Sequence, residues 1–390
     1  MQTNSLASQF LLRKDVTFLN FGSFGACLRP VFERYQQYQV ELEEEPVRFI
    51  TVNGPKYLEQ SRQALGEYLN CPGEDVVYVT NPSYAVNIIA KSLNVKEGDE
   101  ILTTHLEYGA CDRTFRYYCR KAGAKWVKFE VPFPLTTKEE FVEQFMKLAN
   151  EKTKLIFISH LTSSTGLRLP VEEICKAAKA RGILTFVDGA HGPGQVPVDL
   201  NAMDVDIYTG ACHKWMMTPK GSSFLYVKRE HQQLFDPLII SWGYEAAKPS
   251  HSQFLDYHQM QGTRDFSAFL TVPVAIDFMK QHDWPQVNAA CRKLVQENAT
   301  AFCKLLNTSP LAPVHDDFIA QLYSAEIKTK EPEKLHHYFF DQNKIEIPVM
   351  PHGDKVYLRY SIQAFNSQAD MDKLFDAIKD IQKTTSLIES

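Results

Sequence analysis

The sequence predicts an α/β protein with a mainly parallel sheet, followed by a smaller α+β domain. Short β-rich runs alternate with helix-like segments from about residue 56 to 228, an alternation typical of a parallel sheet covered by helices. After about residue 266 the pattern changes to long helical stretches and then to mixed strands and helices. The chain has 390 residues, of which 44% are hydrophobic, so it is long enough for two or three domains.

Five apolar, β-rich runs in the first part are predicted strands. They lie at residues 75–79, 100–103, 155–158, 184–187 and 223–227. Helices are expected between them. For example, Val171, Ile174 and Ala178 repeat at helical spacing within residues 171–181, and Gly182 suits the end of that helix.

The change of pattern predicts three regions. Residues 1–50 hold a short extended piece and a charged helix, and we expect them to pack with the small domain. Residues 51–265 form the large domain that contains the sheet. Residues 266–390 form the small domain, with helices ending near residues 282 and 306 and strands near 319–327 and 355–361.

The composition limits the classes of partner. The formal net charge is -5 and no long run of Lys or Arg is present, which argues against nucleic acid and anionic membranes and favours a small molecule. The eight cysteines include no CxxC pair, so we expect reduced thiols and no metal site. Residues 1–13 lack a signal-peptide pattern and no run is long enough to span a bilayer. We therefore predict a cytoplasmic protein without a membrane segment.

Two neighbouring segments carry residues suited to pyridoxal 5'-phosphate (PLP). Asp188 ends an apolar strand, at the sheet edge where open α/β folds bind ligands, and its carboxylate can hold a pyridine nitrogen protonated. A pyridinium ring stabilises negative charge at the α-carbon of an amino acid. Lys214 follows one sheet element later, beside His213 and before a Pro-Lys-Gly turn, so its amine can form a Schiff base in the same pocket.

The Asp-Gly-Ala-His segment at 188–191 and the His-Lys-Trp segment at 213–221 resemble those of the class V aminotransferases. The likeness covers nearly the whole chain and is most specific to the isopenicillin N epimerase-like branch, through residues 19–25, 107–114 and 261–265. The resemblance implies the type I PLP-dependent transferase fold, with a mainly parallel seven-stranded sheet in the large domain. It also implies a homodimer with active sites shared across the interface.

The resemblance places several side chains around the cofactor. Tyr108 falls where the family stacks a ring on it. Ser83 through its hydroxyl, Tyr84 through its backbone and His213 are expected at the phosphate, at the start of a helix. Thr263 matches a residue that reaches the phosphate of the neighbouring subunit.

The resemblance also shows one position where this sequence departs from the family pattern, and it implies further contacts with the cofactor and the substrate. Ala211 stands where the family usually has a serine that binds the phosphate, and Thr209 is the candidate replacement. His191 and Ser163 match positions that contact the cofactor, His191 at its phenolic oxygen. Arg359 matches the arginine that grips the α-carboxylate of the substrate, which suits its planar guanidinium.

Some flanking residues are open to two interpretations. Arg264 and Asp265 either line the site or form a mutual ion pair, and Trp242 and Tyr244 either line the substrate pocket or belong to the core.

The sequence leaves the reaction open. Lys214, once freed by the substrate, is the predicted base for the Cα proton, and the resulting quinonoid can lead to epimerisation, transamination or β-elimination. Tyr108 is the candidate for a second acid. Residues 345–358 contain no cysteine, which argues against a desulfurase with a persulfide, whereas a carbon-sulfur β-lyase of the cysteine desulfhydrase kind remains an alternative. A nicotinamide-dependent oxidoreductase is disfavoured because residues 81–84 carry no glycine fingerprint.

Overall fold

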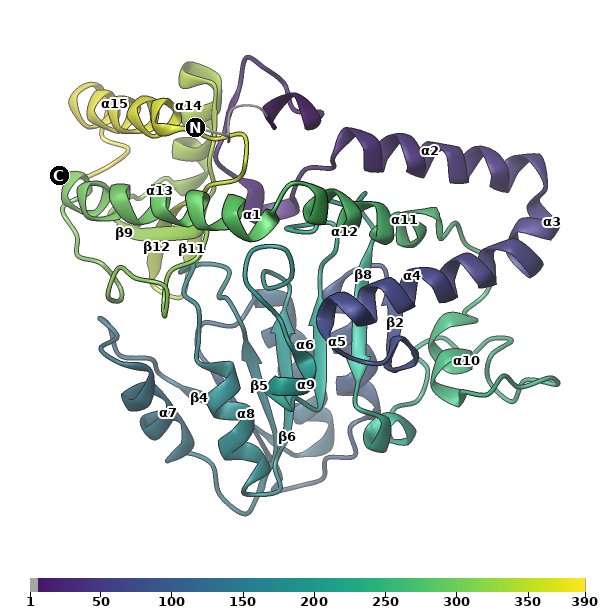
Figure 1. Ribbon diagram of the computed structural model, residues 1–390. Helices are drawn as coiled ribbons and strands as arrows, with labels where there is room; N and C mark the ends of the chain where they lie inside the picture. The colour runs from purple at the N-terminus through teal and green to yellow at the C-terminus, as the bar shows by residue number, and fades with distance from the viewer. Residues whose placement is uncertain (1–5, 390) are drawn as a thin grey trace.

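A seven-stranded sheet forms the centre of the large domain in the computed structural model, which describes residues 6–389 (Figure 1). Its strands, in spatial order, are β2 (Val76–Val79), β8 (Ser223–Val227), β7 (Ile207–Gly210), β6 (Leu184–Gly189), β5 (Thr153–Ser159), β3 (Glu100–Thr104) and β4 (Lys125–Phe129). β8 runs antiparallel to both of its neighbours, and the other pairs are parallel. The predicted mainly parallel α/β sheet is confirmed.

All five predicted strands are present, and two strands were not predicted. β4 is an edge strand in which Lys125 and Lys128 are exposed, so it lacks the apolar run of a central strand. β7 has only four residues, and the Thr-Gly at its end resembles a turn in the sequence. Neither strand was predicted, because neither shows a continuous apolar run in the sequence.

Helices cover both faces of this sheet. The elements of the large domain and of the N-terminal segment are α1 (Phe21–Phe24), α2 (Arg29–Glu44), α3 (Pro46–Arg48), α4 (Gly54–Leu69), α5 (Pro82–Ser92), α6 (Gly109–Ala122), α7 (Lys138–Met146), α8 (Val171–Lys179), α9 (Leu200–Met203) and α10 (Gln253–Gln259). Alternate residues of the strands enter two separate buried clusters, as Ile156 and Phe157 do in β5. Since both faces are buried, the inner strands are mostly apolar.

The C-terminal part has its own three-stranded antiparallel sheet in the order β11 (Val349–His352), β12 (Lys355–Ser361), β9 (Leu322–Ile327). Its helices, with those that lead into it, are α11 (Ser267–Leu270), α12 (Val272–Gln281), α13 (Trp284–Leu305), α14 (Pro332–Asn343) and α15 (Gln368–Thr384). β1 (Thr17–Phe18) pairs with β10 (Ile345–Glu346), which brings the N-terminal segment beside the C-terminal elements (Figure 1). The division at residues 50 and 265 stays a prediction.

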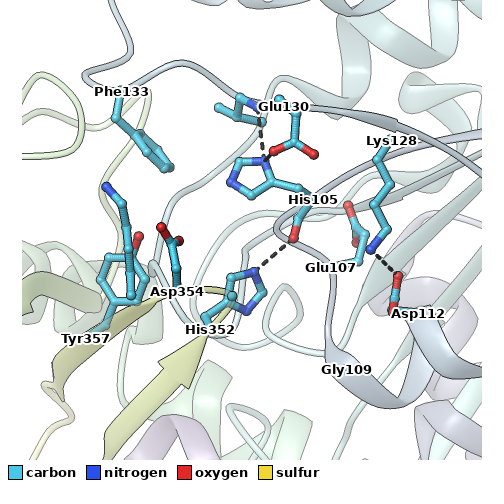
Figure 2. A pocket seen from close by; sticks show the side chains of 13 residues that line it. His105, Glu107, Gly109, Asp112, Lys128, Glu130, Phe133, His352, Asp354 and Tyr357 are labelled. Carbon is cyan, nitrogen blue, oxygen red and sulfur yellow. Dashed lines mark hydrogen bonds and ion pairs between the residues drawn. The ribbon is translucent and has the colours of Figure 1, made fainter. Parts of the chain in front are cut away.

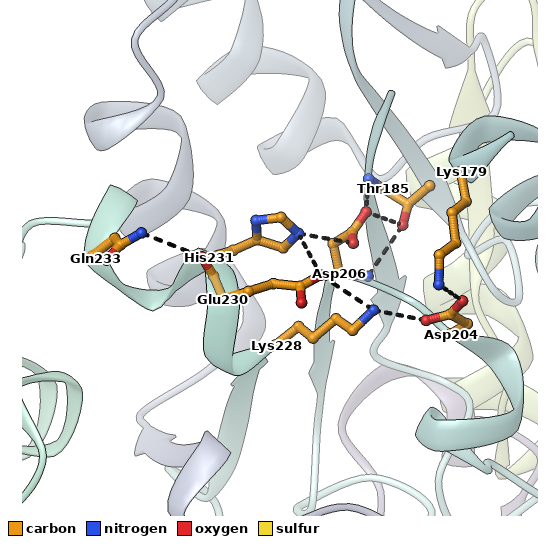
Figure 3. A network of polar contacts seen from close by, with 8 residues as sticks. All are labelled: Lys179, Thr185, Asp204, Asp206, Lys228, Glu230, His231 and Gln233. Carbon is orange, nitrogen blue, oxygen red and sulfur yellow. Dashed lines mark hydrogen bonds and ion pairs between the residues drawn. The ribbon is translucent and has the colours of Figure 1, made fainter. Parts of the chain in front are cut away.

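Charged residues at the amino ends of β6 and β7 form a polar network (Figure 3). Asp206 accepts hydrogen bonds from the Thr185 amide (2.8 Å) and hydroxyl (2.9 Å), and it lies 3.1 Å from His231 Nε2. Asp204 pairs with Lys179 and with Lys228. These contacts join the starts of β6 and β7 to the end of α8 and to the segment after β8, at the sheet edge opposite to the predicted ligand site.

No helix among residues 6–389 is both long enough and apolar enough to cross a membrane. The eight cysteines all lie in this range and all are free.

Candidate active site

A cavity of about 710 Å³ opens at the carboxyl ends of the parallel strands. Seven of the predicted site residues line it, namely Ser83, Tyr108, Ser163, Asp188, His191, His213 and Lys214. They come from the segments that follow β2, β3, β5 and β7 and from the end of β6. Parallel strands end at one edge of the sheet, so residues far apart in the sequence meet there. Tyr84, Thr263 and Arg359 do not line the cavity.

Asp188 is buried in β6 and held by two donors. The amide of Ala190 donates to its Oδ1 (3.0 Å), and Cys111 Sγ lies 3.5 Å from its Oδ2. Burial raises the pKa of this carboxyl, and the Ala190 amide and the Lys214 charge oppose the rise. A buried carboxylate that faces the cavity without a full ion pair suits a cationic ring nitrogen.

Lys214 Nζ lies 3.2 Å from His191 Nε2. Trp215 Nε1 donates to His191 Nδ1 (3.2 Å), so the proton of the neutral imidazole is on Nε2, facing the lysine. Burial lowers the pKa of Lys214 to about 8, while Asp188 raises it and Arg359 lowers it further. Burial also lowers the pKa of His191 well below its usual value. The amine is therefore partly neutral near physiological pH, which is the nucleophilic form.

At the start of α5, the backbone amide of Tyr84 was expected to bind the phosphate, and the structure differs from this expectation. The side chain of Asn81 accepts the amide of Tyr84 (2.9 Å), so this amide is already capped and Tyr84 does not face the cavity. The phenol of Tyr84 donates to Gln261 Oε1 (3.1 Å) instead. Ser83 does line the cavity, as predicted, and it is the remaining candidate at this helix start.

An imidazole and a lysine lie near this end of the cavity. His213 Nδ1 donates to the carbonyl of Ser222 (2.8 Å), which leaves Nε2 for a ligand, and burial lowers the pKa of His213 to about 4. Lys220, which the sequence analysis did not select, also lines the cavity and donates to the carbonyl of Gly25 (3.3 Å). Its position in the Pro-Lys-Gly turn was visible in the sequence, but the direction of its side chain was not. Thr209 donates to the carbonyl of Phe224 (2.8 Å) and does not line the cavity, so it does not replace the serine lost at Ala211.

Arg359 projects from β12 and is 1% exposed. Nη1 donates to the carbonyl of Ser163 (2.5 Å) and Nη2 to the hydroxyl of Ser23 (3.2 Å), both of which belong to residues that line the cavity. Nε has no hydrogen-bond partner among residues 6–389. Burial lowers the pKa of Arg359 to about 10. A buried guanidinium with only neutral partners suits an incoming carboxylate.

The exposed residues of the predicted site differ in whether they line the cavity. Tyr108 precedes α6, and its side chain, 50% exposed, stands at the cavity wall where a flat ligand can stack. Thr263 is exposed in the loop after α10. Trp242 is 84% exposed, so it is neither core nor pocket wall, and Tyr244 is 38% exposed.

Arg264 and Asp265 form no mutual ion pair. Arg264 donates to Gln261 Oε1 (3.3 Å), and Asp265 accepts from Gln39 (3.2 Å).

Glu107 is a buried carboxyl that the sequence analysis quoted only as part of a motif. The hydroxyls of Thr104 (2.7 Å) and Ser159 (2.6 Å) donate to its two oxygens. Burial raises its pKa to about 7, and Asp188 adds to the rise. Ser159 pairs with Asp188 across β5 and β6, which places Glu107 beside the predicted site.

We expect Glu107→Gln to change the pH dependence of stability. In the folded protein the pKa of Glu107 is raised from 4.5 to about 7. The wild type therefore loses about 3 kcal/mol of stability from this group as the pH rises from about 4.5 to about 7. The glutamine variant does not lose this stability, because its side chain does not ionise. Its free energy of unfolding should therefore exceed that of the wild type by more at pH 8 than at pH 5. Urea denaturation at the two pH values measures this. Glu151→Gln, at an exposed position, is the control, and equal pH dependence in all three proteins would contradict the assignment.

The donor set fits PLP. A buried carboxylate is available for the ring nitrogen, a partly neutral lysine for the aldehyde, and Ser83, His213 and Lys220 for the phosphate. Arg359 is left without an anionic partner, as a site that receives an amino acid requires.

Comparison with known proteins gives the same family. Residues 27–374 match the family model described as "Aminotransferase class-V". The chain is 32% identical to isopenicillin N epimerase of Amycolatopsis lactamdurans, over 96% of this chain and 97% of that protein. It is 28% identical to the putative L-cysteine desulfhydrase 1 of Oryza sativa subsp. japonica, over 93% of this chain and 82% of that protein. Among solved structures, the apo cysteine desulfurase of Thermococcus onnurineus NA1 aligns with a TM-score of 0.84 at 20% identity, over 97% of this chain and 98% of that one.

The structural similarity confirms the type I fold, and the family match covers most of the chain. The chain belongs to the class V aminotransferase family and is a PLP-dependent enzyme, as its motifs predict.

Proposed function

We propose that this enzyme removes the proton from the α-carbon of an amino acid, with Lys214 as the base. The observation that carries the proposal is the pairing of a half-buried lysine with a buried guanidinium that has only neutral partners among residues 6–389. Lys214 lines the cavity, and Arg359 donates to Ser163 and Ser23 at its wall. An amino acid whose carboxylate binds Arg359 would present its α-carbon to the lysine.

PLP, when bound, supplies an electron sink for the charge that develops at the α-carbon. Asp188 would keep the ring nitrogen protonated, because it is buried and already held by the Ala190 amide. Ser83, His213 and Lys220 would hold the phosphate. His191 would donate its Nε2 proton to an oxygen of the ligand, since Trp215 occupies its Nδ1.

A carbon-sulfur β-lyase is the second candidate. The similarity to proteins named as L-cysteine desulfhydrases supports it. The cysteine that lines the cavity, Cys111, lies against Asp188, and residues 345–358 contain no cysteine. A nucleophilic cysteine is therefore not the expected route. Elimination would need only the base Lys214 and an acid for the leaving group, and Tyr108 at the cavity wall supports that role.

The experiment that tests the proposal follows the α-proton. The PLP-loaded enzyme is incubated in D₂O with a panel of L- and D-amino acids, and proton NMR detects deuterium at the α-carbon. Exchange supports the proposed base. Pyruvate and sulfide release from cysteine would select the lyase, and inversion at the α-carbon would select the epimerase. Exchange with none of the amino acids, together with no other turnover of them, would contradict the proposal.

We also propose a homodimer and a cytoplasmic location. Support for the dimer comes from exposed apolar residues near Thr263, namely Ile240 (62% exposed), Trp242 (84%) and Met260 (49%). Such a surface close to a threonine predicted to reach a partner's phosphate suits an interface. Support for the location comes from the eight free cysteines.

Trp242→Glu is expected to weaken the dimer, because it would bury a carboxylate in an apolar interface. Sedimentation velocity should show a shift from dimer to monomer at micromolar protein. Leu148→Glu is the matched control, since Leu148 is 39% exposed and follows α7, far from α10 (Figure 1). A dimer of unchanged stability in the Trp242 variant would place the interface elsewhere.

A further inference from the structure

A second cavity, of about 590 Å³, lies between the ends of β3 and β4 and the hairpin of β11 and β12 (Figure 2). Glu107 and Gly109 line it, while Tyr108 between them lines the first cavity. One short segment is therefore the wall between the two cavities.

The second cavity also adjoins the predicted carboxylate site. Tyr357 lines it, and Arg359 stands two residues further along β12. Residues two apart in a strand project from the same face, at a spacing of about 7 Å. Tyr357, which lines the second cavity, therefore stands about 7 Å from Arg359 along the strand, a distance comparable with the length of an extended long side chain.

His352 ties the hairpin to both walls. Its Nε2 donates to the carbonyl of His105 (2.8 Å) (Figure 2). Nδ1 is therefore the acceptor and receives the hydroxyl of Ser164 (3.1 Å). Ser164 follows Ser163, whose carbonyl accepts from Arg359. These two bonds fix the position of the cavity relative to the guanidinium.

The charges that line the second cavity are not balanced. Its two lysines are neutralised, Lys128 by Asp112 (2.6 Å) and Lys355 by Glu326 (2.8 Å). Asp354 has no hydrogen-bond or ion-pair partner within residues 6–389.

Glu130 is the other uncompensated carboxylate. It lies 3.6 Å from His105, whose Nδ1 accepts the amide of Val131 (3.0 Å). Because Nδ1 accepts this amide, it has no proton to donate to Glu130, and burial also lowers the pKa of His105. Two carboxylates therefore face a cavity whose cations are already paired.

We propose that the second cavity binds the side chain of the substrate and selects one that ends in a cationic group, such as an ammonium or a guanidinium. The inference rests on the proposed function, because Arg359 must hold the α-carboxylate for the side chain to enter. The aliphatic part of such a side chain would lie against Val131, Phe133 and Tyr357, which line the same cavity.

The test compares three amino acids of similar length. L-lysine carries a distal ammonium, L-norleucine carries no distal charge, and L-2-aminoadipate carries a distal carboxylate. Dissociation constants for the PLP-loaded enzyme are measured by calorimetry and by the change in the cofactor spectrum. Exposed ion pairs change affinity about two- to fivefold each, so we expect L-lysine to bind about tenfold more tightly than L-2-aminoadipate, with L-norleucine between them.

The double variant Asp354→Asn with Glu130→Gln is expected to reduce this ratio to about twofold. Both positions are exposed, so folding should not change. Glu151→Gln, an exposed carboxylate at the amino end of β5, should keep the wild-type ratio.

Two results would overturn the inference alone. One is a wild-type enzyme that binds the three amino acids equally well, and the other is a preference for L-lysine that the double variant retains. A PLP-loaded enzyme that responds to no amino acid of any charge would instead overturn the proposed function, and this inference with it.

Discussion

Replacement of Lys214 by alanine is expected to lower turnover by at least about 10³-fold, because a positioned base contributes about 10²–10⁴-fold and the cofactor loses its covalent attachment as well. The direct measurement is chemical. The PLP-loaded protein is reduced with borohydride and digested, and the phosphopyridoxyl label is located by mass spectrometry. The wild type should carry the label on Lys214, and the variant should carry none.

Lys220→Ala is the matched control, since Lys220 is a second lysine that lines the same cavity. This variant should keep the label on Lys214 and bind PLP more weakly, because it removes a charge near the predicted phosphate. A label on Lys220 in the wild type would reverse the two assignments.

Arg359→Met is expected to raise KM for the amino acid about 100-fold or more while the protein remains folded. Two charge-assisted hydrogen bonds to a carboxylate contribute about 1.5–3 kcal/mol each, and losing the pair costs about 3 kcal/mol or more of binding. Stability should change much less, because the guanidinium is buried with one nitrogen unpartnered and its partners are neutral. We expect the free energy of unfolding to fall by less than about 1 kcal/mol.

Arg359→Lys separates charge from geometry. It keeps the positive charge but loses the planar pair of donors, so KM should lie between those of the wild type and the methionine variant. Steady-state kinetics and urea denaturation on the same preparations supply both readouts. A loss of 3 kcal/mol or more of stability with unchanged KM would mean that Arg359 is a structural residue.

Most of the fold was predictable because it depends on local patterns. The five predicted strands are apolar runs buried on both faces, and a run of that kind is visible without any knowledge of its neighbours. β4 and β7 were not predicted because β4 carries two exposed lysines and β7 ends in Thr-Gly, so neither shows a continuous apolar run. The antiparallel direction of β8 was likewise not visible, because direction is a property of the pair.

Most of the predicted residues line the site, but some of the contacts predicted for them are not made. Asp188, His191, His213 and Lys214 line one cavity as their motifs led us to expect. The amide of Tyr84 was expected to be free, but Asn81 caps it. That cap is a local hydrogen bond at the start of a helix, so the sequence could have indicated it: Asn three residues before an amide of the first turn is a common cap.

The sequence by itself determined the fold class, the family and the residue types that hold the cofactor, because these depend on short motifs and on the periodicity of apolar residues. Only the tertiary structure decided which groups are buried and what faces them. The shifted pKa values of Lys214 and Glu107, the unpaired guanidinium of Arg359 and the second cavity all arise where segments distant in the sequence exclude water from one another. Burial and the identity of a neighbour across the fold are long-range properties, and no local pattern encodes them.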